Sequence, residues 1–140
     1  MPATTTFVLE NNLAELERLA EYVEQFGEAH CLSPKDVFQV NLALDEVVTN
    51  VISYGYEDSE NHKITVTLVL TDGILRITVI DDGKVFNPLH IPSPDFCTPL
   101  EDKEIGGLGF HFVRKVMKHI AYERSGNQNF LTLDKELTTQ

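Results

Sequence analysis

The pattern of apolar and polar residues begins with a short alternating stretch, residues 4–9, that predicts a strand. Behind it, apolar residues recur every three or four positions, as they do on one face of a helix. Asn12 and Glu15 stand at the spacing of a capping box and are expected to begin this helix. Gly27 follows the last apolar position, so it is expected to end the helix.

A second helix is predicted immediately afterwards. Ser33 can cap its first turn, and Pro34 suits the first helical position because that position needs no backbone N–H. Apolar side chains between Val37 and Val51 form a stripe along one face. Gly55 is expected to stop this helix.

The second half of the chain predicts two hairpins separated by an irregular stretch and a helix. Residues 63–70 and 74–80 alternate around a Thr-Asp-Gly turn, and a shorter hairpin is expected over residues 120–133. Residues 84–107 contain four prolines and little periodicity, which is typical of a functional lid. Glycines then lead into an amphipathic helix that continues from Phe110.

The order of these elements predicts an α+β fold. Strand, helix, helix, hairpin, lid, helix and hairpin are best satisfied by a two-layer α/β sandwich, in which about three helices cover one face of about five strands. The sheet is expected to be mixed rather than wholly parallel. Residues 1–140 are expected to form one domain, because a chain of this length buries enough surface for a core.

The charge of the chain excludes some classes of partner. It carries 22 acidic and 11 basic residues, for a net charge of −11. Nucleic acids and anionic membranes attract clustered Lys and Arg, so neither is expected as a direct partner. A phosphate ligand would need a local site built from glycine amides, a helix N-terminus and a bound metal.

The two cysteines and the start of the chain indicate a cytoplasmic protein. Cys31 and Cys97 lie far apart and show neither metal-site nor disulfide-framework spacing. No charged and then apolar leader opens the chain, and no apolar run approaches the ~20 residues of a membrane helix. We expect a reduced protein that is neither secreted nor membrane-spanning.

The first candidate motif lies in the second helix, in the segment LALDEVVTN. Glu46 and Asn50 are four residues apart and therefore share one helix face. A carboxylate that accepts a hydroxyl proton and an amide oxygen that binds a hard cation suit this stacking. The alternative is an ordinary solvated helix face.

The second motif, DDGKVFNP, follows the strand that ends the first hairpin. Asp81 would lie at the end of a buried strand, where it can accept a hydrogen bond from an exocyclic amine. Gly83 would let a planar ring approach the backbone. The alternative is a polar turn in which neither residue binds a ligand.

The third motif is GGLG, which opens the last predicted helix with Gly106, Gly107 and Gly109. Free backbone amides and the helix dipole at such a start form an anion site. The alternative is that these glycines only end the lid.

In this order, the three motifs resemble the ATP-binding domain shared by gyrase, heat-shock chaperones, histidine kinases and mismatch-repair proteins. DDGKVFNP and EIGGLGFHFV are most similar to the anti-sigma-factor serine/threonine kinases of that histidine-kinase-like superfamily. The resemblance covers nearly the whole chain. It implies ATP and Mg²⁺ as ligands.

The resemblance also implies a role for each motif. Asp81 would receive the adenine amino group, and Gly83 would line the base pocket. Asn50 would coordinate Mg²⁺, and Glu46 would act as the general base. The amides of the glycine-rich helix start would cradle phosphate, with Gly106, Gly107 and Gly109 as its glycines.

The implied function is an ATP-dependent serine/threonine protein kinase that acts as an anti-sigma factor. It would bind a sigma factor and phosphorylate an anti-sigma-factor antagonist protein, and the resemblance allows a homodimer. The alternative is a nucleotide-sensing, non-catalytic anti-sigma binding module. A histidine-kinase fragment is less favoured, because no phosphoacceptor-histidine helix pair precedes the motifs.

Two positions depart from relatives of this class. Some members carry an arginine just before the glycine pair, where this chain has Ile105 and its nearest cation is Lys103. That difference concerns phosphotransfer more than binding. Many members also have histidine where this chain has Tyr54.

Overall fold

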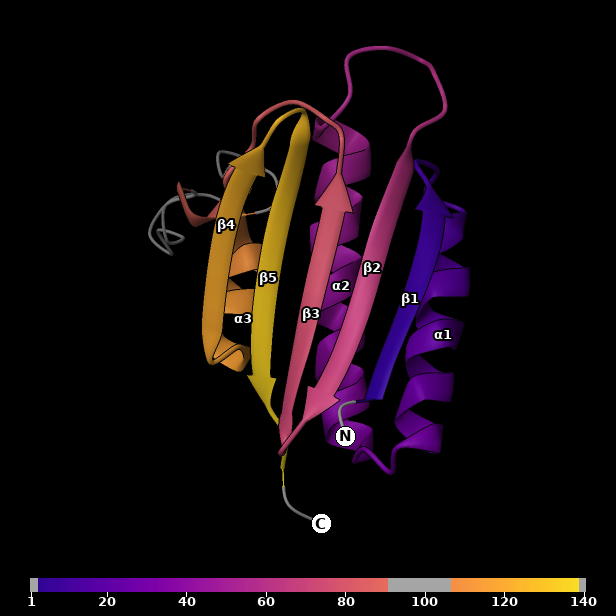
Figure 1. The fold of residues 1–140 in the computed structure, drawn as a ribbon, viewed down its shortest axis with the longest axis vertical. Helices are drawn as coiled ribbons and strands as arrows, with labels where there is room; N and C mark the ends of the chain where they lie inside the picture. The colour runs from indigo at the N-terminus through magenta and orange to yellow at the C-terminus, as the bar shows by residue number, and fades with distance from the viewer. Residues whose placement is uncertain (1–2, 91–106, 139–140) are drawn as a thin grey trace.

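The computed structural model describes residues 3–90 and 107–138, which form a five-stranded sheet with helices on one face (Figure 1). The strand order is β1-β2-β3-β5-β4, so β1 and β4 are the edges. The strands are β1 (Ala3–Glu10), β2 (Lys63–Thr71), β3 (Ile74–Asp81), β4 (His119–Ser125) and β5 (Gln128–Glu136). The helices are α1 (Glu15–Ala29), α2 (Pro34–Tyr54) and α3 (Gly107–Val116), with a 3-10 turn η1 (Pro88–His90). The predicted α+β sandwich is confirmed.

The sheet is antiparallel throughout, which corrects the expectation of a mixed sheet. Two consecutive helices separate β1 from β2, and this helical hairpin returns the chain in the direction opposite to β1. β3 and β4 do run parallel to each other, with α3 between them in the chain. However, β5 inserts between these two strands and pairs with both, so no parallel neighbours remain.

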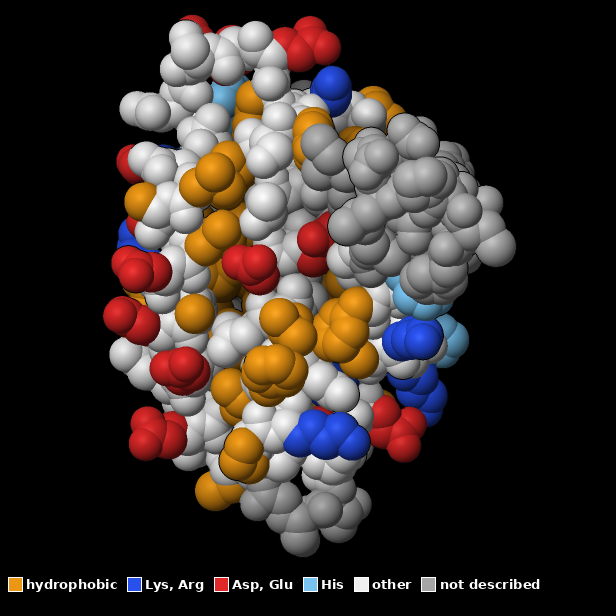
Figure 2. All heavy atoms as spheres, turned by 180° about the vertical axis from the view of Figure 1, so that it is seen from behind, with side chains coloured by type: hydrophobic (Ala, Val, Ile, Leu, Met, Phe, Trp, Pro, Cys, Tyr) orange, Lys and Arg blue, Asp and Glu red, His pale blue; other side chains and the backbone are white. Residues whose placement is uncertain are grey.

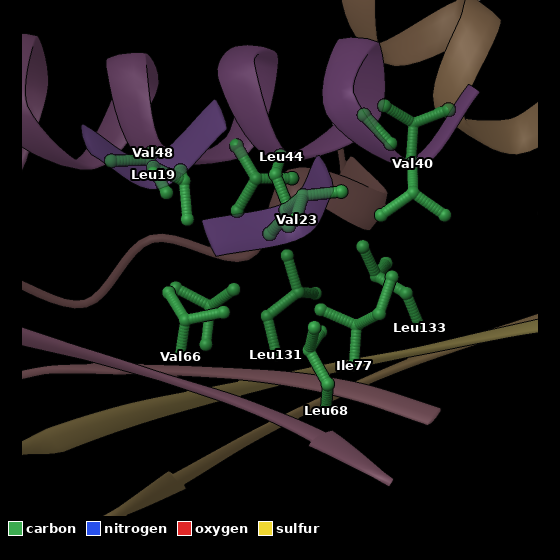
Figure 3. Packing of buried hydrophobic residues seen from close by; sticks show 14 of the residues in the cluster. Leu19, Val23, Val40, Leu44, Val48, Val66, Leu68, Ile77, Leu131 and Leu133 are labelled. Carbon is green, nitrogen blue, oxygen red and sulfur yellow. The ribbon is translucent and has the colours of Figure 1, made fainter. Parts of the chain in front are cut away.

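The core lies between the sheet and the helices (Figure 3). Alternate residues of each strand point toward the helices, as the two-residue period of a strand requires. Val66, Leu68 and Ile77 rise from the sheet to meet Leu44 and Val48 of α2, and all of these side chains are 0% exposed. This layer fixes α2 over the sheet, and with it the face of α2 that carries the candidate residues.

The limits of α1 differ from the prediction at both ends. The helix begins at Glu15, and the residue at its N-cap position, Ala14, makes no side-chain capping hydrogen bond. Asn12 lies two residues earlier, where its Oδ1 accepts a hydrogen bond from the Ala14 amide at 2.9 Å. Gly27 does not end the helix, which continues to Ala29. A β carbon at Gly27 would lie 2.5 Å from Cγ2 of Val37, so this glycine permits close packing of α1 on α2.

The predicted limits of α2 and of both hairpins are confirmed to within a few residues. The Ser33 hydroxyl accepts a hydrogen bond from the Asp36 amide at 3.0 Å, which is the expected N-cap, and Gly55 is the C-cap. In the first hairpin turn, Asp72 and Gly73 have φ values of 50° and 78°, the left-handed region expected for a tight turn. The sequence therefore predicted these helix caps and this turn correctly.

The outer surface of the helical layer contains exposed apolar side chains over its central part (Figure 2). Leu13 of the segment before α1 and Phe38 and Leu42 of α2 are 52%, 62% and 40% exposed. Phe38 and Leu42 border a groove of about 230 Å³ between α1 and α2. Apolar surface gathered in this way is typical of contact regions between proteins.

Most of the predicted lid, residues 84–107, lies outside the described residues. Its first part, residues 84–90, is described and ends in η1. Within the described parts of the chain, no helix combines the length and apolar character needed to cross a bilayer.

Candidate functional site

The predicted site residues that the structure describes belong to elements that meet at one end of the sheet (Figure 1). β3 and β4 end there and β5 begins there, close to where α2 ends and α3 begins. The strand register places Asp81 of β3 opposite Asn129 of β5, and Asn129 opposite Arg124 of β4. A row of polar side chains therefore crosses three strands at the edge of an otherwise apolar layer.

Glu46 and Asn50 lie on one face of α2, as predicted, and their side chains are in contact. The amide Nδ2 of Asn50 donates a hydrogen bond to Oε1 of Glu46 at 3.1 Å. Asn50 is only 6% exposed and lines a pocket, so this face is not the solvated surface of the alternative interpretation. Burial raises the pKa of Glu46; the Asn50 hydrogen bond opposes that effect and the charge of Asp45 adds to it.

Gly109 lies in the first turns of α3, directly against Glu46. A β carbon on this glycine would overlap the Glu46 carboxylate, so only glycine fits without a shift of that side chain. The structure thus brings the third motif to the first, although they are far apart in the sequence. Gly107 is the first residue of α3, whereas Gly106 lies outside the described residues.

Asp81 ends β3 as a buried carboxylate, 5% exposed, and lines the same pocket as Asn50. Its Oδ1 accepts hydrogen bonds from the Gly83 amide at 2.8 Å and from Nδ2 of Asn129 at 2.9 Å. Burial raises the pKa of Asp81 above its usual range; these two hydrogen bonds oppose the effect of burial. A strand-end carboxylate held in this way is a strong acceptor for a ligand N–H.

Gly83 supports Asp81 rather than lining the pocket in this structure. A β carbon here would lie 2.5 Å from the carbonyl oxygen of Gly55, at the end of α2. The next residue, Lys84, donates its backbone N–H to the same carbonyl at 2.8 Å. The turn after β3 is therefore fastened to the C-terminus of α2, and glycine is required by this close approach.

Asp82 points away from the pocket and pairs with His62, in agreement with its interpretation as a turn residue. Nδ1 of His62 lies 3.2 Å from Asp82, and Nε2 lies 2.8 Å from Asp58. Ligand atoms of Asp58, Glu60 and His62 also lie within 4.8 Å of one another. Because both ring nitrogens already contact carboxylates, this geometry fits an imidazolium ion held between two acids.

The pocket between these residues is apolar apart from a few polar groups. Val47 and Val51 of α2, Val79 of β3 and Leu131 of β5 contribute its apolar wall. Phe86 and Pro88, from the segment after β3, also line it. The cavity volume is about 30 Å³, which is room for about one water molecule. This volume is too small for a planar base, so the pocket must widen before a base can enter.

The donor set fits a nucleotide with a hard cation. Nδ2 of Asn50 donates to Glu46, whereas Oδ1 of Asn50 has no hydrogen-bond partner among the described residues. An amide oxygen is a suitable ligand for Mg²⁺. α3 begins at Gly107, and backbone amides and the helix dipole at such a helix start favour phosphate. Asp81 supplies the acceptor that an aminopurine needs.

Sequence reasoning missed three residues at this site: Tyr122, Arg124 and Asn129. Tyr122 and Asn129 line the pocket, and Nη1 of Arg124 donates to the Gly83 carbonyl at 2.7 Å. Their strands were predicted, but nothing in the sequence placed β5 beside β3. The available signal was the polar Asn129, which stands two and four positions before the apolar Leu131 and Leu133 and therefore shares their inward-facing side of the strand.

The sequence matches the family described as "Histidine kinase-like ATPase domain" over residues 9–135. The serine/threonine-protein kinase BtrW of Bordetella bronchiseptica is 29% identical over 96 residues, which cover 69% of this chain and 68% of the relative. The anti-sigma F factor of Geobacillus stearothermophilus is 24% identical over 93 residues, covering 66% of this chain and 64% of the relative. The match thus spans just under two thirds of that anti-sigma factor.

Solved structures share the fold at low sequence identity. The structure of the RsbU and RsbW domains of a Mycobacterium tuberculosis protein superposes with a TM-score of 0.71 at 16% identity, covering 99% of this chain and 33% of that one. A blue-light activated histidine kinase domain from Erythrobacter litoralis gives a TM-score of 0.53 at 18% identity, covering 89% of this chain and 60% of that one. The resemblance seen in the sequence is confirmed: this chain belongs to the histidine kinase-like ATPase domain family.

Proposed function

We propose that this protein binds Mg²⁺-ATP and transfers the terminal phosphoryl group to a serine or threonine of a partner protein, as an anti-sigma-factor kinase. The observation that carries this proposal is the convergence of three separate motifs on one pocket. Asp81 lines that pocket with Asn50, Asn50 contacts Glu46, and Glu46 contacts Gly109.

The adenine end of the nucleotide is assigned to the pocket lined by Asp81. Its carboxylate accepts the exocyclic amino group, while Val79 and Leu131 provide apolar contact for the ring. This places the phosphates toward Asn50 and the N-terminus of α3. The backbone amides around Gly107 and Gly109 then stabilise the negative charge of the phosphates.

Glu46 is proposed as the general base. A serine hydroxyl is a poor nucleophile at neutral pH, and a carboxylate within hydrogen-bond reach can accept its proton during phosphoryl transfer. The hydrogen bond from Asn50 orients the Glu46 carboxylate at the entrance to the phosphate region. Mg²⁺, bound through Asn50 Oδ1, would neutralise charge on the phosphate oxygens.

The partners are proposed from the relatives. BtrW is named a serine/threonine-protein kinase, and several matching relatives are named anti-sigma F factor. We therefore infer that this chain binds a sigma factor and phosphorylates an antagonist protein. The exposed apolar groove beside Phe38 and Leu42 is consistent with contacts to a protein partner.

A comparison of three variants tests the proposal. Asp81→Asn is expected to weaken ATP and ADP equally, because it removes the acceptor for the base. Asn50→Ala is expected to weaken only the Mg²⁺-dependent part of binding. Glu46→Gln keeps the shape of the side chain, so ATP affinity should stay near normal while phosphotransfer falls by ~10² to 10⁴ in rate. Calorimetry gives the affinities, and mass spectrometry detects phosphoserine on the antagonist.

The same assay distinguishes a kinase from a nucleotide-sensing binding module. A wild-type protein that binds ATP and its partner but transfers no phosphate would exclude the kinase, and Glu46→Gln would then change nothing. A wild-type protein that does not bind ATP would exclude both the kinase and the nucleotide-sensing module. Thr78→Val, in β3 and outside the pocket, is the control: it should bind ATP and transfer phosphate like the wild type.

A further inference from the structure

Asn129 is a buried amide inside the proposed base pocket. It is 5% exposed and lines the pocket beside Asp81. The register of the sheet places it between Asp81 on β3 and Arg124 on β4. A buried amide is costly unless its polar atoms have partners, so its contacts reveal how it is used.

All four hydrogen-bonding positions of the Asn129 amide are occupied. Nδ2 donates to Oδ1 of Asp81 at 2.9 Å and to the carbonyl oxygen of Lys84 at 2.9 Å. Oδ1 accepts from the Tyr122 hydroxyl and from Nη1 of Arg124 at 3.2 Å. An amide offers two donor hydrogens and two acceptor sites, so this set is complete.

Two of these partners fix the orientation of the amide, because the Arg124 guanidinium can only donate and the Lys84 carbonyl can only accept. If the amide rotated by 180°, its NH₂ group would face the Arg124 guanidinium, which can only donate, and its oxygen would face the Asp81 carboxylate, which only accepts when ionised. Both contacts would be lost. Arg124 therefore keeps an amide hydrogen pointed at Asp81, and Tyr122 supports the same orientation by donating to Oδ1.

This arrangement leaves Asp81 with one carboxylate oxygen for a ligand. Oδ1 already receives the Gly83 amide and the Asn129 amide. Oδ2 has no hydrogen-bond partner among the residues that the structure describes. A fixed, ionised Oδ2 can only accept, so it attracts an amino group and repels a carbonyl oxygen at the same position of a base.

Building on ATP as the proposed ligand, we propose that Asn129, held by Tyr122 and Arg124, is the positioning residue that makes this pocket select a base with an exocyclic amino group. It acts through Asp81, by occupying one oxygen and stabilising the ionised carboxylate. Inosine triphosphate is the informative competitor, because it carries a carbonyl where ATP carries the amino group.

The charged groups around Asp81 determine how the pocket responds to pH. Burial raises the pKa of Asp81, the hydrogen bonds from Asn129 and Gly83 lower it, Asp82 raises it and Arg124 lowers it. Tyr56 also lies close enough to sense the Asp81 charge. The hydrogen bond from Asn129 is the largest of the effects that lower the pKa of Asp81. Without Asn129, Asp81 would therefore stay protonated up to a higher pH. A protonated Asp81 offers an O–H to a carbonyl base.

The test measures dissociation constants for Mg²⁺-ATP and Mg²⁺-inosine triphosphate from pH 5.5 to 8.5 by calorimetry. Asn129→Leu removes the amide, and Tyr122→Phe removes only one hydroxyl while keeping the ring. Thr132→Val, on the same strand as Asn129 but outside the pocket, is the control. Each variant is compared with wild type for the same ligand, so protonation of the ligand cancels.

We expect Asn129→Leu to weaken ATP by ~10-fold at neutral pH, the effect of losing a hydrogen bond to a charged group. Binding of inosine triphosphate should weaken less than binding of ATP, so the ratio of their two dissociation constants should move closer to one. The loss for ATP should grow as pH falls from 8.5 toward the raised pKa of Asp81. Tyr122→Phe should shift the pH dependence of ATP binding in the same direction as Asn129→Leu but by a smaller amount. Thr132→Val should match wild type.

Equal loss of both nucleotides at every pH would show that Asn129 only supports the fold, and would overturn the inference. If Asn129→Leu does not fold, as judged by circular dichroism, Tyr122→Phe decides: an unshifted pH profile and unchanged preference overturn the inference. A wild-type protein that binds neither nucleotide is a different result, because it removes the proposed function itself.

Discussion

Gly109 of α3 packs directly on the carboxylate of Glu46 in α2, with no room for a β carbon between them. This contact joins the helix start proposed to hold phosphate to the proposed general base. Because the residue in contact is the mobile end of a glutamate side chain, a methyl group at position 109 would displace the carboxylate rather than break the fold.

Gly109→Ala should therefore separate activity from stability. Alanine favours a helix over glycine by ~1 kcal/mol, so the free energy of unfolding in urea should not fall. Displacement of a catalytic group by about 1 Å can cost ~10² in rate, and phosphotransfer should fall by that order. In a Glu46→Gln background, Gly109→Ala should cause no further loss, since both changes act through one carboxylate. Independent, additive losses would contradict this coupling.

Phe86 should control the rate at which nucleotide enters. The pocket volume of about 30 Å³ is too small for a base, and Phe86 is one of the side chains that line the pocket. Phe86→Ala should raise the association rate several-fold in stopped-flow measurements, because binding would no longer wait for this side chain to move. Val85, which is 65% exposed, provides the control Val85→Ala with no expected change. An unchanged association rate in Phe86→Ala would show that the pocket opens elsewhere.

His62 should make a pH-dependent contribution to stability. Its pKa is raised above 6.5, first by the hydrogen bond to Asp58 and then by the one to Asp82. The folded state therefore binds the proton more tightly than the unfolded state, so the stabilisation is complete below 6.5 and is lost as pH rises through the raised pKa. Urea unfolding of wild type and His62→Gln should differ most near pH 6 and converge at alkaline pH. A constant difference from pH 5.5 to 9 would contradict this.

Gly27→Ala should destabilise the fold although it improves helix propensity. The added methyl would lie 2.5 Å from Cγ2 of Val37, inside the contact between α1 and α2. Overpacking of this kind costs ~1 to 3 kcal/mol, which exceeds the gain of ~1 kcal/mol from replacing a helical glycine. The double variant Gly27→Ala/Val37→Ala should recover part of the loss in urea unfolding. Recovery would not occur if the glycine were needed for its backbone conformation.

Elements with local signals were predictable from the sequence. The cap at Ser33, the turn at Asp72 and Gly73, and the amphipathic helices each depend on residues that are neighbours in the chain. Gly27 shows where this reasoning fails. A glycine after the last apolar position is typical of a helix end, but here it is selected by the close approach of a second helix, which no local pattern reports.

The candidate site was predictable only in part, for the same reason. Glu46, Asn50 and Asp81 stood in motifs whose spacing carries chemistry, and the structure brings Glu46, Asn50 and Gly109 together. Asn129 carried no motif. Its position at the site comes from strand order, because β5 lies between β3 and β4 and so places residue 129 opposite Asp81, 48 positions away.

The late place of β5 in the chain also determines when the base pocket can form during synthesis. β1, β2 and β3 are complete by Asp81 and are neighbours in the sheet, whereas β5, which pairs with β3, begins only at Gln128. During synthesis on the ribosome, the base pocket is therefore completed only after nearly the whole chain has emerged. We expect a nascent or truncated chain that lacks β5 to leave Asp81 without its Asn129 partner and to bind no nucleotide.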